Sequence, residues 1–520
     1  MTESTSTVPA VKLKSRLLGV RHHQKTSDEQ VIRVPGIGQG ISTVYEQFRN
    51  AAEYNEEHLL LQRATRRFLN RNLSFHSQRN VGDIGNELII ELTQAGYLPN
   101  SSVKNETANT IQTLVVKYMN VYRDLRKERV PAEVAVSWVL DILSVNSAWL
   151  LDPHNERVVF AYFAYEHYLK LFPKEAFITD PSEVKLYEIS LYVAAQRALL
   201  KSDLATVRSD LINLYQKGPE DLEDFIEFNQ DITTIFLSPL TQKLRRAINK
   251  YGAPLRILKR LIEDHPELPD ALDNRSVFLA LYEKQTYKEY KSVARRLNKG
   301  LIKSIVFLLI TKAVIGVSVE IPYDLITVGS VAFMPLGINL LFPPLYMAGL
   351  KFGLRPPSHQ NAQALIAYID KALFTHEQPI KPALKAMTQS ISAVSKFVYT
   401  LAFFIPFAIT VFVLTLLHFN IVQTIIFFVF LSTASFLGFR LSQIIRELEI
   451  VTKDLGLIQA ARDFFYLPFI VVGQWLSNKY AKINLIGAIL DLLIELPLKT
   501  VLRLLRQWLR FINDRREQIY

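Results

Sequence analysis

One lysine lies inside a long apolar stretch, where a charged side chain is costly and calls for a functional explanation. Lys312 is the only ionisable residue of the run 304–319. Its candidate partners are Asn339 in the next apolar run and the acids Glu320 and Asp324, which follow the lysine along the chain. Glu320 is roughly 12 Å away along a helix. Two interpretations stay open: the lysine snorkels or locks a helical hairpin, or it handles an ion or a substrate.

Elsewhere the sequence has no recognisable catalytic or metal-binding motif. The absence of cysteine removes thiolate zinc sites, iron–sulfur clusters and cysteine nucleophiles. None of His58, His167 and His265 has the glutamate three residues earlier that a helical di-iron site requires. The glycines of residues 36–40 lack the Gly-Lys-Ser/Thr of a phosphate-binding loop, so a hinge explains them better. The sequence therefore predicts a non-enzymatic protein without a cofactor or a bound metal.

Apolar residues are concentrated in the second half of the chain, in runs long enough to cross a bilayer. Residues 325–350, 397–417 and 420–439 carry no charged side chain. About 20 apolar residues at 1.5 Å each cross a hydrocarbon layer of about 30 Å. The run 304–319 is shorter, so it spans only if flanking charged side chains reach the two membrane surfaces. We therefore predict four transmembrane helices arranged as two hairpins.

The basic residues predict the side of the membrane that each connection faces. Lysine and arginine are frequent at residues 284–303 and 351–396, whereas the connections at 320–324 and 418–420 contain neither. Because these residues are retained on the cytoplasmic side, both termini are predicted to be cytoplasmic. The same distribution accounts for the excess of 60 basic over 49 acidic residues, so no nucleic-acid partner is needed.

The first half of the chain reads as a series of amphipathic helices. Thr43 and Glu46 form a capping-box pattern, Pro131 precedes a helix over Ala132–Leu151, and Asp221 is placed to cap another. No stretch alternates apolar and polar residues between turn signals, as a strand in a hairpin would. The predicted fold class is therefore all-α.

The predicted organisation is a soluble helical domain, a four-span helical membrane domain and a C-terminal amphipathic helix. The expected boundaries are a flexible basic tail at 1–40, a cytoplasmic helical domain at 41–300, a first transmembrane hairpin at 301–350, a cytoplasmic connection at 351–396, a second transmembrane hairpin at 397–440 and a cytoplasmic or interfacial helical tail at 441–520. Within that tail, the apolar run 464–476 is too short to span and is predicted to be re-entrant or interfacial.

The last predicted helix has a basic face opposite an apolar face. Large apolar residues, Trp508 among them, recur at helical spacing on one side. The bases on the other side are Lys499, Arg503, Arg506 and Arg510. Such a helix lies on an anionic membrane leaflet, or it packs on the protein's own core with its bases in solvent.

Two segments resemble a group of uncharacterised bacterial multi-pass membrane proteins that have no assigned activity. The segments are residues 45–69 (YEQFRNAAEYNEEHLLLQRATRRFL) and residues 493–511 (LIELPLKTVLRLLRQWLRF). The resemblance implies a location in the bacterial inner (cytoplasmic) membrane. It transfers no functional residue.

These features favour a non-enzymatic scaffold or tether over a transporter. The expected partners are the lipid bilayer, anionic lipid headgroups and proteins that bind the helical domain. The alternative is a small ion or solute transporter based on Lys312 and the proline-containing spans. Four spans are few for a transporter acting alone, so that alternative requires a homo-oligomer.

Overall fold

The computed structural model describes residues 9–22, 31–34, 42–43, 46, 57–73, 83–153, 155–178, 181–327, 329–351, 354, 356–375, 393–450 and 457–482. Across these ranges the regular structure is helical, and the only β-type pairing is an isolated bridge between Val31 and Lys104. The predicted all-α class is confirmed. The chain divides into two compact units: unit 1 is Met1–Ser15, Lys170–Ala176 and Asn249–Ile483, and unit 2 is Arg16–Leu169, Phe177–Ile248 and Asn484–Tyr520.

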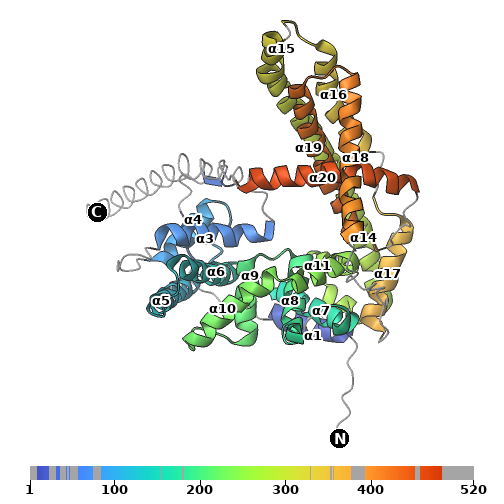
Figure 1. The fold of residues 1–520 in the computed structure, drawn as a ribbon. Coiled ribbons are helices and arrows are strands. Elements are labelled where there is room, and N and C mark those ends of the chain that lie inside the picture. The colour runs from blue at the N-terminus through green and yellow to red at the C-terminus, as the bar shows by residue number, and fades with distance from the viewer. Residues whose placement is uncertain are drawn as a thin grey trace, which may run out of the picture. The chain divides into compact units, whose positions relative to one another are not determined.

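Unit 2 is built around one apolar helix, α6 (Ala132–Leu151), which begins directly after Pro131 as predicted. It packs against α3 (Leu60–Asn72), α5 (Asn105–Lys127) and α9 (Leu204–Tyr215). The other helices of unit 2 are α4 (Ile84–Gln94), α8 (Tyr187–Ala195), α10 (Leu222–Leu237) and most of α7 (Asn155–Leu171) and α11 (Pro239–Tyr251) (Figure 1). The side chain of Asp221 caps α10 by accepting from the Asp224 backbone N–H, as its position in the sequence indicated.

Unit 1 contains the longest helix of the described residues. α14 (Arg275–Ile315) continues through a π-helical turn (Gly316–Glu320) into α15 (Ile321–Thr327), so no helix boundary marks the expected domain boundary at residue 300. The other helices of its apolar part are α16 (Phe333–Leu350), α18 (Ala393–Leu416), α19 (Ile421–Arg446) and α20 (Leu457–Lys482). Figure 1 shows α14, α16, α18 and α19 side by side, with α20 lying across them. At the base of α14 lie α12 (Ala253–Asp264), α13 (Leu268–Ala271) and α17 (His359–Phe374).

Four helices of the described residues are long and apolar enough to cross a membrane: Ala132–Leu151, Arg275–Thr327, Phe333–Leu350 and Ile421–Arg446. The first is α6, of whose apolar stretch 61% is buried, against 22% for Arg275–Thr327. That burial marks α6 as the core helix of unit 2. The predicted span 397–417 coincides with α18, whose apolar part Thr400–Leu416 is slightly shorter than the other four.

The prediction that residues 320–324 form the connection between two spans is wrong, because these residues are helical. Glu320 closes the π-helical turn and Asp324 lies in α15, and the chain turns only after Thr327, where Gly329 has a φ of 77°. Both acids are buried and hydrogen-bonded there, whereas a surface loop would have left them in solvent. The π-helical turn ends just before Pro322, which has no N–H to donate to a regular helical ladder. The next helix therefore begins at Phe333 rather than at residue 325.

The apolar run 464–476 lies within a single continuous helix, α20, that contains Pro468. Gly473 lies against α19. The backbone oxygen of Ser432 and the side chain of Phe436 occupy the space that a Cβ atom of residue 473 would need. A Cβ atom on Gly473 would lie 2.7 Å from the Cβ of Phe436, which is closer than carbon atoms pack. The close approach of α19 and α20 therefore requires glycine at this position.

We expect Gly473→Ala to destabilise the protein by about 1–3 kcal/mol, because the added methyl group overpacks the α19–α20 contact. The measurement is the thermal unfolding midpoint of the purified full-length chain in detergent. Gly337→Ala in α16 is the matched control, since no atom lies within 4 Å of a Cβ built there. That variant should be neutral or gain up to ~1 kcal/mol from the better helix propensity of alanine. Equal midpoints for the two variants would contradict the close contact.

Candidate functional site

Lys312 is buried and paired with the first of the acids that the sequence offered as partners. The exposed fraction is 1% for Lys312 and 0% for Glu320, and the ammonium forms an ion pair with one carboxylate oxygen, Oε1. The Lys312 Nζ atom also lies 5.0 Å from the centre of the Phe430 ring of α19, a cation–π distance. The π-helical turn between the two charged residues ends at Glu320 itself.

The second carboxylate oxygen of Glu320 extends the contact to two further helices. The Asn339 side-chain amide of α16 donates to Glu320 Oε2 at 3.1 Å. The same amide nitrogen donates to the backbone oxygen of Gln423 in α19 at 3.2 Å. The ion pair is therefore joined through Asn339 to both neighbouring helices.

Asp324 does not contact Lys312 directly and instead forms a second cluster around Gln423. Its carboxylate accepts from Gln423 Nε2 at 3.0 Å, from Asn420 Nδ2 at 2.7 Å and from the Ala332 backbone N–H at 3.2 Å. Gln423 takes part in both clusters, because its backbone oxygen faces Asn339 and its side chain faces Asp324. We call this set the hairpin junction: Lys312, Glu320, Asp324, Asn339, Asn420 and Gln423.

Sequence reasoning missed Asn420 and Gln423 as members of the hairpin junction. Their spacing is that of a capping box, and the structure contains one: the Asn420 side chain accepts from the Gln423 backbone, and the Gln423 side chain accepts from the Asn420 backbone. That pattern at the start of an apolar run was the available signal. The four bases Lys499, Arg503, Arg506 and Arg510 lie outside the described residues.

Two groups of the hairpin junction are not fully satisfied by the other residues of the junction. Its formal charge is −1, because one lysine faces two acids, and Asp324 is held by neutral donors. The Asn339 side-chain oxygen is buried without a hydrogen-bond partner among the described residues. A carboxylate without a cation and a free amide oxygen are groups that a cation or a proton could use.

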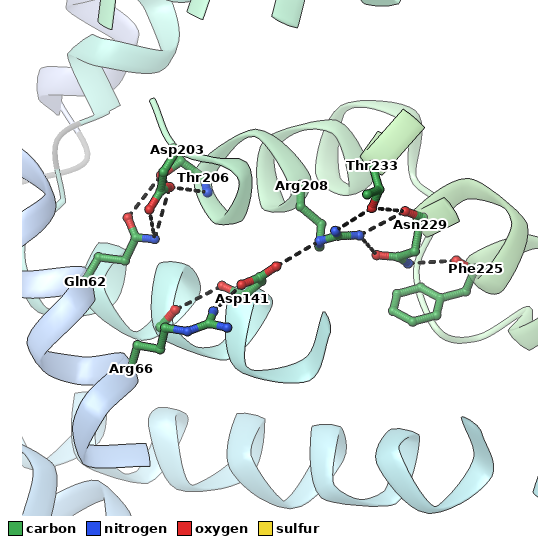
Figure 2. Close-up of polar contacts among 10 residues, drawn as sticks. Gln62, Arg66, Asp141, Asp203, Thr206, Arg208, Phe225, Asn229 and Thr233 are labelled. Atoms are coloured by element: carbon green, nitrogen blue, oxygen red, sulfur yellow. Dashed lines mark hydrogen bonds and ion pairs between the residues drawn. The ribbon is translucent and has the colours of Figure 1, made fainter. Parts of the chain in front are cut away.

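A second buried charged cluster lies in unit 2, centred on Asp141 of α6 (Figure 2). The Asp141 carboxylate accepts from Arg66 of α3 through one oxygen and from Arg208 Nε of α9, at 3.1 Å, through the other. Arg208 is itself buried, and burial lowers the pKa of its guanidinium while the Asp141 carboxylate opposes that shift.

The remaining Arg208 donors are met by α10. The Nη1 atom donates to the Asn229 side-chain oxygen at 2.7 Å and to the Asn229 backbone oxygen at 3.1 Å, and Nη2 donates to Thr233 Oγ1 at 3.0 Å (Figure 2). The cluster joins four helices, and its two buried charges, Arg208 and Asp141, are paired with each other. We interpret it as structural, since a buried charge is tolerated when it is paired and hydrogen-bonded. The single acid in the middle of an apolar helix was the sequence signal for Asp141.

Asp210, two residues after Arg208, is a half-buried acid of a different kind, whose Oδ1 atom is shielded from solvent. The Gln196 side chain donates to its Oδ2 atom, and Oδ1 has no hydrogen-bond partner among the described residues. Burial raises the pKa of Asp210 to about 7, and the hydrogen bond from Gln196 opposes that shift. Gln196 begins a second π-helical turn (Gln196–Leu200), and its side chain also donates to the Tyr192 hydroxyl at 3.1 Å.

Comparison with protein-family models, with curated proteins and with solved structures finds no match to the chain. The resemblance of residues 45–69 and 493–511 to bacterial membrane proteins therefore stays a prediction. The function has to be argued from the geometry of the chain itself.

The raised pKa of Asp210 predicts that unit 2 loses stability as the pH rises. The folded protein binds a proton more tightly than the unfolded chain, so the stabilisation is complete at low pH and is lost as the pH rises through about 7. Asp210→Asn should remove this dependence and be more stable than the parent at pH 8 by about 2 kcal/mol, a figure discounted for partial exposure.

The measurement is the difference in thermal midpoint between the parent and Asp210→Asn at pH 5.5 and at pH 8. Because the parent and the variant share all other titrating groups, the effect of those groups on the thermal midpoint cancels in the difference. A difference that does not change with pH would show that Asp210 titrates near its ordinary value.

Proposed function

We propose that the chain is a multi-pass protein of a bacterial inner membrane that acts as a non-enzymatic scaffold or tether. In this proposal the apolar helices of unit 1 form two transmembrane hairpins, and both termini are cytoplasmic. Proteins bind the helical unit 2, and the spans face the lipid bilayer. One observation carries the proposal: the polarity of the unit 1 helices is inverted relative to a water-soluble protein.

The inversion is clearest in α14. Phe307 and Val314 are 54% and 59% exposed, while Lys312 between them is 1% exposed. The same holds in α16, where Phe333 is exposed and Asn339 is buried, and in α19, where Ile425 is exposed and Gln423 is buried. Water would favour the opposite arrangement, because exposed apolar surface costs about 25 cal/mol per Å². A hydrocarbon layer favours this one, because polar groups there must be satisfied within the protein.

The scaffold role is supported by the links that the hairpin junction makes between helices. Lys312 is neutralised by Glu320, and the links through Asn339 and Gln423 tie the first hairpin to the second. A membrane part held in one arrangement by buried polar links is suited to anchoring, since moving a span would break several of them at once. The cluster around Asp141 holds unit 2 in the same way.

A transporter is the second candidate function, and the unpartnered oxygen of Asn339 beside Glu320 is the observation that favours it. Glu320 and Asp324 are acids buried in apolar helices, which is where proton and cation pathways are found. With four spans, this function requires several copies around a common path. The two candidates make different predictions for the Lys312–Glu320 pair.

For a scaffold, we expect Lys312→Met alone to destabilise the protein by about 3–5 kcal/mol, because it leaves the Glu320 carboxylate buried without its partner. The double variant Lys312→Met, Glu320→Met should recover most of that loss, since an apolar pair of similar volume replaces the charges. Lys284→Met, at an exposed position of the same helix, is the control and should change little. Thermal midpoints in detergent and cation or proton flux into proteoliposomes are the two measurements.

The double variant separates the two candidates. Recovered stability with no flux in either the parent or the variant supports the scaffold. A cation or proton flux that the parent shows and the stable double variant has lost would replace the scaffold with the transporter.

The proposed topology predicts which single cysteines react with a membrane-impermeant thiol reagent in intact cells. The chain contains no cysteine, so each variant carries one label site. Ser330→Cys and His418→Cys, at exposed turns, should be labelled from outside. Asn298→Cys in α14 and Gln360→Cys in α17, also exposed, should be labelled only after permeabilisation. Labelling of Gln360→Cys in intact cells would rule out the two-hairpin arrangement.

A further inference from the structure

Two close helix contacts show which residues of α14, α16 and α19 lie at the same depth. A Cβ atom on Gly300 of α14 would lie 2.6 Å from a methyl carbon of Leu441 in α19. Three residues earlier in α19, Gly438 faces a methyl group of Leu350 in α16. Gly438 and Leu441 are less than one helical turn apart, so the three helices are level at these two contacts.

Basic residues gather at this level on all three helices. They are exposed and lie within one helical turn of the two contacts. They are Lys299 and Lys303 of α14, Lys351 at the C-cap of α16 and Arg440 of α19. We call this set the basic belt. None of its three lysines forms an ion pair with an acid in the part of the chain that the structure describes. The belt therefore presents several positive charges at one depth with no acid of its own to neutralise the lysines.

On α14 the belt coincides with a change from basic to apolar along one face. Bases recur every four residues from Lys291 through Arg295 and Lys299 to Lys303, and all are exposed. The next exposed side chain four residues on is Phe307. Because residues at this spacing share one helix face, the same stripe changes from charged to apolar within one turn. That change is typical of a helix that passes from a membrane surface into hydrocarbon.

Helix α20 lies across the bundle just on the apolar side of the belt (Figure 1). Its Gly473 contacts Ser432 and Phe436 of α19, four to eight residues before Arg440, which is roughly 6–12 Å along that helix. Four large apolar side chains form one exposed stripe along α20: Phe464, Leu467, Val471 and Trp475. The Lys479 ammonium lies 5.8 Å from the Trp475 ring centre. A helix in this orientation buries its apolar stripe about 5–10 Å below the headgroups.

We propose that the basic belt binds the headgroups of anionic phospholipids of the cytoplasmic leaflet, with their acyl chains lying over the apolar stripe of α20. The chemistry is a phosphodiester anion held by exposed lysines and an arginine, next to an apolar surface at acyl-chain depth. This inference rests on the proposed insertion of unit 1 in a membrane. It adds a lipid preference that insertion alone does not require.

The test uses the full-length protein in phosphatidylcholine vesicles that contain a trace of a spin-labelled lipid. The fraction of label immobilised by the protein is measured for phosphatidylglycerol and for phosphatidylcholine labels. At low salt we expect phosphatidylglycerol to be preferred by about fivefold, the factor that one basic residue contributes near an anionic surface. The preference should shrink in high salt, because the belt is exposed.

The belt variant replaces all four bases: Lys299→Gln, Lys303→Gln, Lys351→Gln and Arg440→Gln. Its matched control makes the same change in net charge at four other exposed bases: Lys185→Gln, Arg246→Gln, Lys284→Gln and Lys371→Gln. Lys284 is roughly 22 Å along α14 from Lys299, beyond the ~10 Å screening length. The belt variant should lose the preference for phosphatidylglycerol, and the control should keep it.

The outcomes separate this inference from the proposed function. If the parent immobilises both labels equally, or if the control loses the preference as fully as the belt variant does, the lipid site is refuted while membrane insertion stands. If neither label is immobilised, unit 1 is not in the bilayer and the proposed function fails. If inorganic phosphate removes the preference and sodium chloride of the same ionic strength does not, the belt is a phosphate site and the lipid assignment is wrong.

Discussion

The arrangement of the unit 1 helices depends on one requirement, that a charge among apolar helices has its counter-charge and hydrogen-bond partners within the protein. Lys312 meets this requirement through Glu320, and Glu320 needs Asn339 to occupy its second oxygen. The polar contacts thereby link the helix that carries Lys312 to α16 through Asn339, and link α16 to α19 through the backbone oxygen of Gln423. Since each group is buried, a shift of any one helix leaves another polar atom unpaired, at a cost of about 1–3 kcal/mol for each buried group. The packing of the apolar surfaces alone would not select one arrangement so strictly.

The two units use the same device in different surroundings. In unit 2, Asp141 and Arg208 join helices whose apolar residues face inward, so the buried charges lie in an otherwise ordinary core. In unit 1 many large apolar side chains of α14, α16 and α19 face outward, and buried polar groups join these three helices beside a small apolar cluster. Both α6 and the helix Arg275–Thr327 are long and apolar enough to cross a membrane. They differ in packing, because α6 lies in a core and the apolar part of Arg275–Thr327 is largely exposed. Apolar length alone does not distinguish a core helix from a membrane span.

Close backbone contacts complete the packing of the unit 1 helices. Gly300, Gly438 and Gly473 each lie where a side chain would collide with a neighbouring helix. Small residues at such crossings let helices approach closely, which gains dispersion energy. The same contacts bring the basic belt to one depth, so helix packing and the distribution of charge on the surface are set together.

The sequence alone determined the all-α class, the position of the apolar runs, the turn at residues 418–420 and the identity of Lys312 as the buried charge. These follow from local composition and spacing, which do not depend on distant residues. Tertiary structure decided the rest. Glu320 and Asp324 were expected in a surface connection, and only the approach of Asn339 and Gln423 makes a helix more favourable there, because it lets both acids be buried with partners. In the same way, Arg208 pairs with Asp141 across 67 positions of sequence, a contact that no local pattern encodes. Partners of buried charges lie far apart along the chain, and their identity is fixed only when the helices that carry them pack together.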